Sequence, residues 1–443
     1  MLQTIKDCGF NANIWICANI KETSWLNQIS MYYNVAASLG LRTIQNLVNC
    51  VPKVEQNESN SGQSYGLEYN PKLEDNATFF NLNKNDGNLW GYDLGDEPTP
   101  IEWNYDSLTA PLGARDFPAM YRTYLRNANR HVGFFNLVAA TTAGWIGQTL
   151  ANDTSLNEKG KYSRYLKAFK EKFNPSMMSV DIYPVFEETT DSDHSYDLGG
   201  YYLLKRYYYI MEAIGNFSTE HKMPFWMFML STQFNSLEAD GETVRSKHPC
   251  PSEGVLQYQA MTALAYGFQG LVFWTYALKE SSDNEKYITA PYQEGENNEW
   301  ETTPVWTNCK AVIPEIKSYG KELLNARFQE ARHVYGPLCK IEFEETEKLT
   351  SSIGCISGAT ANGRGFVITR LTKNTQNYVA IVSHDPINAQ GITLSIASGY
   401  SPVEVGQTRS VSEDSSEATE PRIASGQTVS RTLRPGGMIL IRY

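Results

Sequence analysis

Short, continuous apolar runs recur at long intervals along the chain up to residue 276. Seven such runs are rich in β-branched or aromatic residues, at 11–16, 42–48, 88–95, 133–141, 177–184, 224–232 and 270–276. Between them lie segments with helical spacing of apolar residues, at 24–40, 117–129, 161–173, 202–214 and 253–267. Continuous runs suit strands that are buried on both faces. The alternation of strands and helices therefore predicts a parallel α/β sheet.

A closed barrel is favoured over an open sheet for this arrangement. The open, doubly wound sheet is the structural alternative, but no Gly-rich dinucleotide fingerprint follows any of the strands. A helix-like segment at 2–10 leads directly into the first strand. We therefore expect a (β/α)8 TIM-type barrel without its usual first strand, either truncated at its N-terminus or with that position filled in another way.

The pattern of apolar and polar residues changes after about residue 332. Short alternating runs are separated by turn residues, at 364–371, 377–385, 392–397, 401–406, 428–433 and 437–443. This pattern is typical of an antiparallel β-sandwich. We expect two domains, a catalytic barrel over 1–332 and an accessory β-sandwich over 333–443.

Charge and hydropathy narrow the classes of partner. The chain has 443 residues and a formal net charge of -11 at pH 7. Such a field repels phosphate backbones and anionic membrane surfaces. No stretch approaches the roughly 20 uninterrupted apolar residues that cross a bilayer. We expect a soluble protein with no nucleic-acid partner and no transmembrane segment.

Cysteine and histidine spacing predicts neither a metal centre nor a cofactor. The six histidines are scattered singly, and the seven cysteines form no C-x-x-C pair. An odd number of cysteines over this length is not a disulfide framework. Lys6 and Asp7 interrupt the opening segment, so no export signal is visible in it.

The ends of the strands are where a barrel carries its active site. The run LWGYDLGDEPTP places Asp96 and Glu97 at such an end, and Pro98 then stops the strand. A carboxylic acid shielded in a cleft can keep its proton at neutral pH and donate it to a leaving group. The alternative is that these acidic residues only cap the following helix.

Two further strand ends carry candidate side chains. MMSVDIYP places Asp181 and Tyr183 on one face, and Asp181 is either the second carboxylate of a glycoside hydrolase or a hydrogen-bonding group for a sugar hydroxyl. GLVFWTY places Trp274 and Tyr276 on one side of a strand. These aromatic residues either bind a pyranose ring or fill the core. We expect Glu97 and Asp181 to point into one cleft lined by Trp274 and Tyr183.

Four motifs together resemble bacterial glycoside-hydrolase-like barrels of clan A, similar to family 42 beta-galactosidases. They are GYDLGDEP, DIYP, PFWMFMLST and PSEGVLQYQAMTALAYGFQGLVFWTYAL. The resemblance covers about residues 5–330, and RTLRPGGMILIRY resembles the closing strand of the β-sandwich in such enzymes. It implies that Glu97 is the acid/base, that Trp274 stacks on the sugar nearest cleavage, and that the protein is extracellular or periplasmic.

The sequence departs from this family where a nucleophile belongs. Clan A enzymes carry a nucleophilic glutamate at the end of the seventh strand, where this chain has Ser231, Thr232 and Gln233. The nearest glutamates in the following loop are Glu238, Glu242 and Glu253. Glu253 is the candidate nucleophile, although its place at the start of a helix is also explained by N-terminal capping.

These observations predict a glycosidase that cleaves an O-glycosidic bond of an oligo- or polysaccharide by carboxyl acid/base catalysis. One alternative is a substrate-assisted, hexosaminidase-like hydrolase, in which an acetamido group replaces the missing nucleophile. The other is a barrel that binds glycan without cleaving it. The sequence leaves open the sugar, the linkage, the stereochemical course, endo or exo action, and the oligomeric state.

Overall fold

The computed structural model describes residues 1–16, 23–54, 73–103, 113–128, 130–190, 195–238, 240–278, 285–295, 299–405 and 423–443. These residues form two compact units. The first unit comprises Met1–Leu156 and Gly160–Asp181, and the second comprises Asn157–Lys159 and Ile182–Tyr443.

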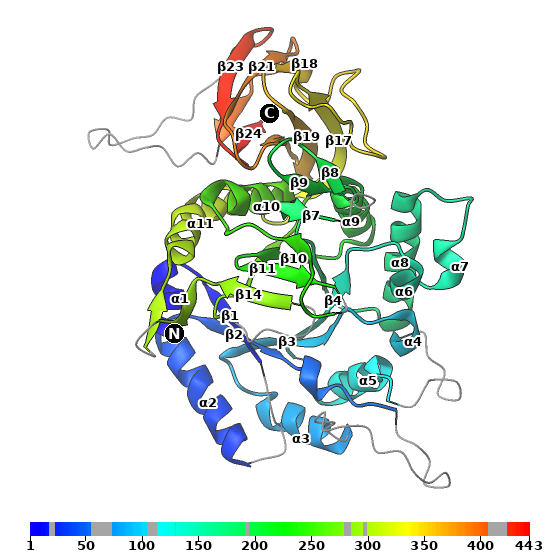
Figure 1. The fold of residues 1–443 in the computed structure, drawn as a ribbon, viewed down its shortest axis with the longest axis vertical. Coiled ribbons are helices and arrows are strands. Elements are labelled where there is room, and N and C mark those ends of the chain that lie inside the picture. Colours follow the sequence, from blue (N-terminus) through cyan, green and yellow to red (C-terminus); the bar gives the residue numbers. More distant parts are fainter. Residues whose placement is uncertain are drawn as a thin grey trace. The chain divides into compact units, whose positions relative to one another are not determined.

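The first unit contains five parallel strands in the order β1-β2-β3-β4-β5, and Figure 1 shows the first four of them in blue to cyan. Its strands are β1 (Ala12–Ile16), β2 (Arg42–Asn46), β3 (Leu89–Asp96), β4 (Val132–Val138) and β5 (Met178–Asp181). Its helices are α1 (Leu2–Cys8), α2 (Thr23–Ser38), η1 (Val48–Cys50), α3 (Leu73–Asn83), α4 (Pro100–Trp103), α5 (Phe117–Asn127), α6 (Ala143–Ile146), α7 (Gln148–Ala151) and all but the first two residues of α8 (Glu158–Phe173). The helix before the first strand is confirmed.

Aromatic packing holds the helices of the first unit against its sheet. On β4, Phe135 packs against Phe169 and Phe173 of α8, with ring centroids 5.3 and 4.8 Å apart. Phe117 of α5 lies so close to β3 that a Cβ on Gly95 would stand 2.1 Å from its ring. Only glycine therefore fits at this position of the GDEP segment.

The second unit contains the remaining two parallel strands and the C-terminal β region. Its barrel elements are β10 (Phe225–Leu230), β13 (Gly270–Trp274), α9 (Tyr207–His221), α10 (Glu253–Ala265) and α11 (Pro304–Leu323). β10 pairs in parallel with β13, in a register that places Met227 beside Leu271. Seven parallel strands with intervening helices make this a TIM-type barrel fold. All seven predicted strands are confirmed.

The C-terminal β region is an antiparallel sandwich. One sheet has the order β17-β19-β20-β24-β22 and the other β18-β21-β23. Side chains from both sheets, among them Phe366, Ile381, Ile392 and Leu394, form one buried core. The strands are β17 (Arg327–Tyr335), β18 (Ile356–Ala361), β19 (Gly365–Lys373), β20 (Gln376–Ser383), β21 (Gln390–Ile396), β22 (Val403–Val405), β23 (Thr428–Leu433) and β24 (Met438–Arg442). The expected domain boundary after residue 332 therefore falls within β17.

Two small antiparallel sheets of the second unit were not predicted. They have the orders β14-β11-β12-β7 and β6-β9-β8, and a further hairpin joins β15 to β16. Their strands are β6 (Val185–Phe186), β7 (Glu188–Thr189), β8 (Ser195–Asp197), β9 (Tyr202–Leu204), β11 (Gln233–Leu237), β12 (Val244–Lys247), β14 (Glu285–Thr289), β15 (Tyr292–Glu294) and β16 (Trp300–Thr302). The helix expected from residue 202 was wrong at its start, because β9 pairs with two neighbours and α9 begins only at Tyr207.

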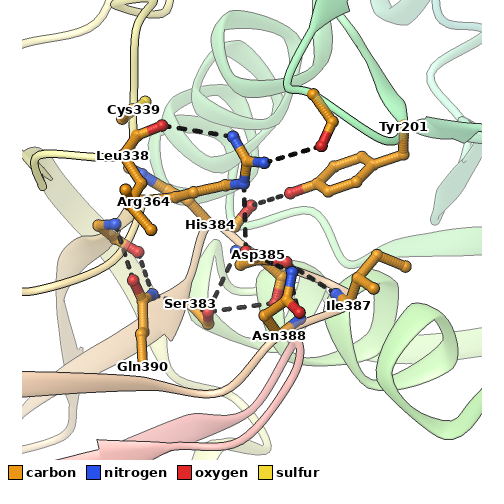
Figure 2. A network of polar contacts seen from close by, with 12 residues as sticks. Tyr201, Leu338, Cys339, Arg364, Ser383, His384, Asp385, Ile387, Asn388 and Gln390 are labelled. Carbon is orange, nitrogen blue, oxygen red and sulfur yellow. Dashed lines mark hydrogen bonds and ion pairs between the residues drawn. The ribbon is translucent and has the colours of Figure 1, made fainter.

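A buried polar network lies at the edge of the sandwich within the second unit (Figure 2). The guanidinium of Arg364 donates to the Asp385 carboxylate at 3.1 Å, and to the carbonyl oxygens of Leu338 at 3.4 Å and Gly199 at 3.3 Å. Asp385 also accepts the backbone N–H of Ile387 at 2.9 Å. The Arg364 and Asp385 side chains are only 13% and 5% exposed. Because burial removes water from both charges, the ion pair between them must replace the hydration that each has lost.

Replacing Arg364 with methionine should lower the stability of the second unit. The substitution leaves the buried Asp385 charge without its cation, which costs roughly 3–5 kcal/mol in comparable pairs. Urea denaturation of the full chain measures the loss. The matched control is K348M, which breaks an exposed ion pair with Glu342 and should cost at most about 1 kcal/mol. Equal losses in both variants would show that the buried network does not stabilise this unit.

Candidate active site

The end of β3 presents two acidic side chains in an unusual backbone conformation. Asp96 is the last residue of β3, and Glu97 follows it with a φ of 44°. This left-handed value is strained for a residue with a Cβ, and residues strained in this way cluster at functional sites. Pro98 is buried, while Asp96 and Glu97 are both partly exposed.

The following helix does not use these acidic residues as its cap. The Glu102 carboxylate accepts the backbone N–H and the hydroxyl of Thr99, each at 3.0 Å, and the bond from the N–H is the half of a capping box in which the glutamate reaches back to the N-cap. Arg115 donates to the same carboxylate at 2.8 Å. Burial acts in the opposite direction, but these bonds lower the pKa of Glu102. Because Thr99 and Glu102 cap α4, the capping explanation is not needed for Asp96 and Glu97.

A row of hydrogen bonds across three neighbouring strands orients the acidic residues. The register pairs Asp96 of β3 with Asn136 of β4, and Asn136 with Ser179 of β5. The Asn136 amide donates to Asp96 at 2.9 Å, and the Ser179 hydroxyl donates to the Asn136 side-chain oxygen at 3.0 Å. The Glu97 N–H donates to the Asn136 carbonyl at 2.8 Å. The next position of the row on β5 is Asp181, paired with Val138.

The carboxyl groups of Glu97 and Asp181 meet at this edge of the sheet. The Asp181 side chain is hydrogen-bonded to that of Glu97, and two carboxyl groups form such a bond only when one of them holds a proton. Burial, then the Glu97 charge, then the Asp96 charge hold the pKa of Asp181 well above its ordinary range. The pair therefore shares one proton under conditions that ionise an isolated carboxylic acid.

A fourth carboxyl group, that of Asp93, is buried. Asp93 of β3 is 1% exposed and accepts a hydrogen bond from the Asn46 amide on β2 at 2.7 Å. Burial, followed by the charge of Asp96, holds the pKa of Asp93 well above its ordinary range. The charge of Asp96 therefore opposes the ionisation of both Asp93 and Asp181.

Tyr165 of α8 brings a phenol to the carboxyl pair. Its hydroxyl is fully buried and makes no hydrogen bond within the described part of the chain. Burial and the charges of Glu97 and Asp181 raise the pKa of Tyr165, so it stays a hydrogen-bond donor. Its ring also borders a cavity of about 300 Å³, together with Trp103, Ile146 and Leu150. The Tyr165 hydroxyl therefore lies within electrostatic range of the two carboxyl groups but is not hydrogen-bonded to either of them.

The predicted aromatic residues belong to the second unit. Tyr183 packs in the small cluster of Leu230, Phe234 and Tyr287. Trp274 ends β13, where its ring meets Phe228 edge to face at 6.3 Å. Tyr276 stacks on Tyr292 with ring centroids 6.2 Å apart. All three predicted residues are partly exposed.

The end of β10 carries no carboxylate. Ser231 and Thr232 are fully buried, and their hydroxyls donate to the carbonyl oxygens of Thr275 at 3.5 Å and Thr289 at 2.5 Å. Glu253 is the first residue of α10 and is exposed, next to the N-cap Ser252. A Cβ on the adjacent Gly254 would stand 2.3 Å from the Pro386 oxygen, so this end of α10 packs tightly against the sandwich.

Metal ligands do not gather anywhere in the described ranges. No group of three or more His, Cys, Asp and Glu side chains there could hold a metal ion. The six cysteines of those ranges are free thiols, and four of them are buried, namely Cys8, Cys50, Cys309 and Cys355. The remaining cysteine, Cys17, lies outside the described residues. No described helix is long and apolar enough to cross a membrane.

Three residues of the site were not predicted from the sequence. Asn136 and Ser179 lie inside apolar strand runs, where a polar residue facing the mouth is a usable signal. Tyr165 lies on a helix rich in tyrosine and lysine, and nothing in its local pattern separates it from neighbouring core tyrosines. Its electrostatic interaction with Glu97 and Asp181 arises only from the tertiary structure.

Several solved structures similar to this chain are glycoside hydrolases. The beta-galactosidase from the psychrophilic Marinomonas ef1 matches with a TM-score of 0.43 and 10% identity, over 72% of this chain and 57% of that chain. A family 1 β-glucosidase from Thermotoga maritima gives 0.41 and 8%, over 70% and 84%. A further structure, described as a glycoside hydrolase, gives 0.46 and 10%, over 100% and 87%. No protein-family model and no curated protein matches the chain.

Replacing Asp181 with asparagine should change how stability depends on pH. The folded pKa of Asp181 lies above its ordinary 3.8, so the wild type loses unfolding free energy as pH rises through that folded pKa. Asparagine keeps the hydrogen bond without the charge. D181N should therefore be more stable than wild type at pH 8 by roughly 1 kcal/mol or more, since each pKa unit between the folded and the unfolded state is worth about 1.4 kcal/mol.

Urea denaturation at pH 3.5 and pH 8 tests this expectation. Wild type and D181N should have similar stability at pH 3.5 and should diverge at pH 8. The control E171Q removes an exposed carboxylate of α8 and should follow the wild type at both pH values. A stability difference between D181N and wild type that is the same at both pH values would contradict the shared proton.

Proposed function

We propose that this protein is a glycoside hydrolase that cleaves an O-glycosidic bond of an oligo- or polysaccharide by acid catalysis at Glu97. The observation that supports it is the hydrogen-bonded pair of Glu97 and Asp181, held with one proton at the carboxyl ends of β3 and β5. Paired carboxyl groups with separated proton affinities are the groups that glycoside hydrolysis uses. The proposal includes the resemblance of the four sequence motifs to family 42 beta-galactosidases.

Glu97 donates the proton and Asp181 positions it. The shared proton passes along the hydrogen bond to Glu97 and then to the glycosidic oxygen, while the bond from that oxygen to the anomeric carbon breaks. Water adds to the anomeric carbon and gives up its own proton to a carboxylate. Asn136 fixes the backbone at Glu97, and the Tyr165 phenol can stabilise the charge left on the pair.

A substrate-assisted course is the second candidate, and the end of β10 favours it. Ser231 and Thr232 stand where clan A enzymes carry a nucleophile, and their hydroxyls are already engaged by backbone carbonyls. An acetamido group of the substrate would then attack the anomeric carbon. Activity on 2-acetamido glycosides, with none on the corresponding 2-hydroxy glycosides, distinguishes this course from attack by water or by an enzyme carboxylate.

Replacing Glu97 with glutamine should slow cleavage in proportion to the need for an acid. Glutamine keeps the shape of the side chain but has no proton to donate. For aryl glycosides with poor leaving groups, kcat/KM should fall roughly 10²–10⁴-fold. For dinitrophenyl glycosides, whose leaving group departs without protonation, the bond-breaking rate should fall far less.

The measurement is kcat/KM over a leaving-group series for wild type, E97Q and the control E171Q. The control should match the wild type across the series. An equal loss for all leaving groups would remove Glu97 from the acid role. Glycan binding by the wild type with no cleavage of any substrate would instead support the alternative of a binding barrel.

A further inference from the structure

We propose that Trp300 is the platform of a carbohydrate-binding site on the second unit, at which a pyranose ring of an oligosaccharide stacks on the indole. This inference rests on the proposed function and extends it, because a sugar-binding platform in addition to the carboxyl pair favours a chain of sugars over a single one. The residues that carry it all belong to the second unit.

Three aromatic rings form a column that ends at Trp300. Tyr276 stacks on Tyr292 with centroids 6.2 Å apart and planes at 23°, and Tyr292 stacks on Trp300 at 5.4 Å and 27°. These values are those of offset-stacked aromatic pairs. Trp300 is nevertheless 49% exposed. The column therefore supports one face of the indole and leaves much of the ring in water.

Hydrogen bonds fix both ends of the β15–β16 hairpin that carries Trp300. Tyr292 donates its N–H to the Tyr276 carbonyl at 2.9 Å and accepts the Leu278 N–H at 2.9 Å. At the other end, the hydroxyl of the buried Thr303 donates to the Ala290 carbonyl at 2.6 Å and accepts the Val305 N–H as the N-cap of α11. The indole is therefore held in position before any ligand arrives, which lowers the entropy lost on binding.

The chemistry around the indole selects a neutral, hydroxyl-rich ligand. The register places Glu294 opposite Trp300 and Thr302 opposite Tyr292, so these four side chains share one face of the hairpin. Glu294 and Thr302 are exposed and offer acceptors to hydroxyl groups. Glu299, also exposed beside Trp300, adds negative charge that repels anionic ligands such as nucleic acids. A pyranose ring offers C–H groups to the aromatic face and hydroxyl donors at its edge.

The test follows the Trp300 indole directly. The full-length chain with the E97Q substitution, which suppresses cleavage, is labelled with ¹⁵N, and W300F identifies the indole resonance of Trp300. Hexasaccharides of β-1,4-linked glucose, mannose, xylose, galactose and N-acetylglucosamine are then titrated in turn. Spermine serves as a polycation arm, because an aromatic ring beside carboxylates can also bind cations.

The expected result is a shift of the Trp300 resonance by at least one hexasaccharide. W300A should weaken its Kd roughly tenfold, and W300F, which keeps a flat ring, should stay within about threefold. The control W90A removes another exposed indole, 43% exposed on β3, and should bind as the parent does.

Three results would overturn the inference. They are no shift with any hexasaccharide, equal affinity of W300A and its parent, and a response to spermine alone. Failure of the proposed hydrolase activity gives a different result. In that case the wild type cleaves no substrate, while the Trp300 resonance still shifts. Cleavage by the wild type without a shift overturns this inference and leaves the hydrolase in place.

Discussion

Two carboxyl groups in hydrogen-bond contact cannot both carry a full negative charge, and this constraint shapes the end of the barrel strands. Glu97 and Asp181 meet there, and the charge of Asp96 opposes ionisation further. The site therefore retains a proton that an isolated carboxyl group would lose. A retained proton is what an acid catalyst must offer to a leaving oxygen.

The register of the parallel strands positions the side chains around this pair of carboxyl groups. Because β3, β4 and β5 are in fixed register, Asn136 stands between Asp96 and Ser179 and joins both through its side chain. The left-handed backbone of Glu97 then continues from that row. The hydrogen bond from the Glu97 N–H to the Asn136 carbonyl and the tight packing of nearby Gly95 against Phe117 hold this strained conformation.

The sequence predicted the parts of the fold that continuous burial determines. Strands such as β4 and β10 are apolar on both faces, so their runs are visible without any tertiary information. β9 and β11 are short, and their pairing depends on distant partners, so the same reasoning assigned residues 202–204 to a helix and left β11 out. At the site, Glu97 and Asp181 were visible as strand ends, but the contact between them and the approach of Tyr165 arise only from tertiary packing.

The central claim is that Glu97 and Asp181 share one proton, and infrared spectroscopy of protonated carboxyl groups tests it most directly. Spectra of wild type, E97Q and D181N are recorded across the acid and neutral range. The account predicts a carboxylic acid band in the wild type that persists above the pH at which exposed carboxyl groups ionise, and that moves to lower pH in each variant. Asp93, intact in all three proteins, should contribute an unchanged band. Wild-type carboxyl bands that neither substitution alters would contradict the shared proton.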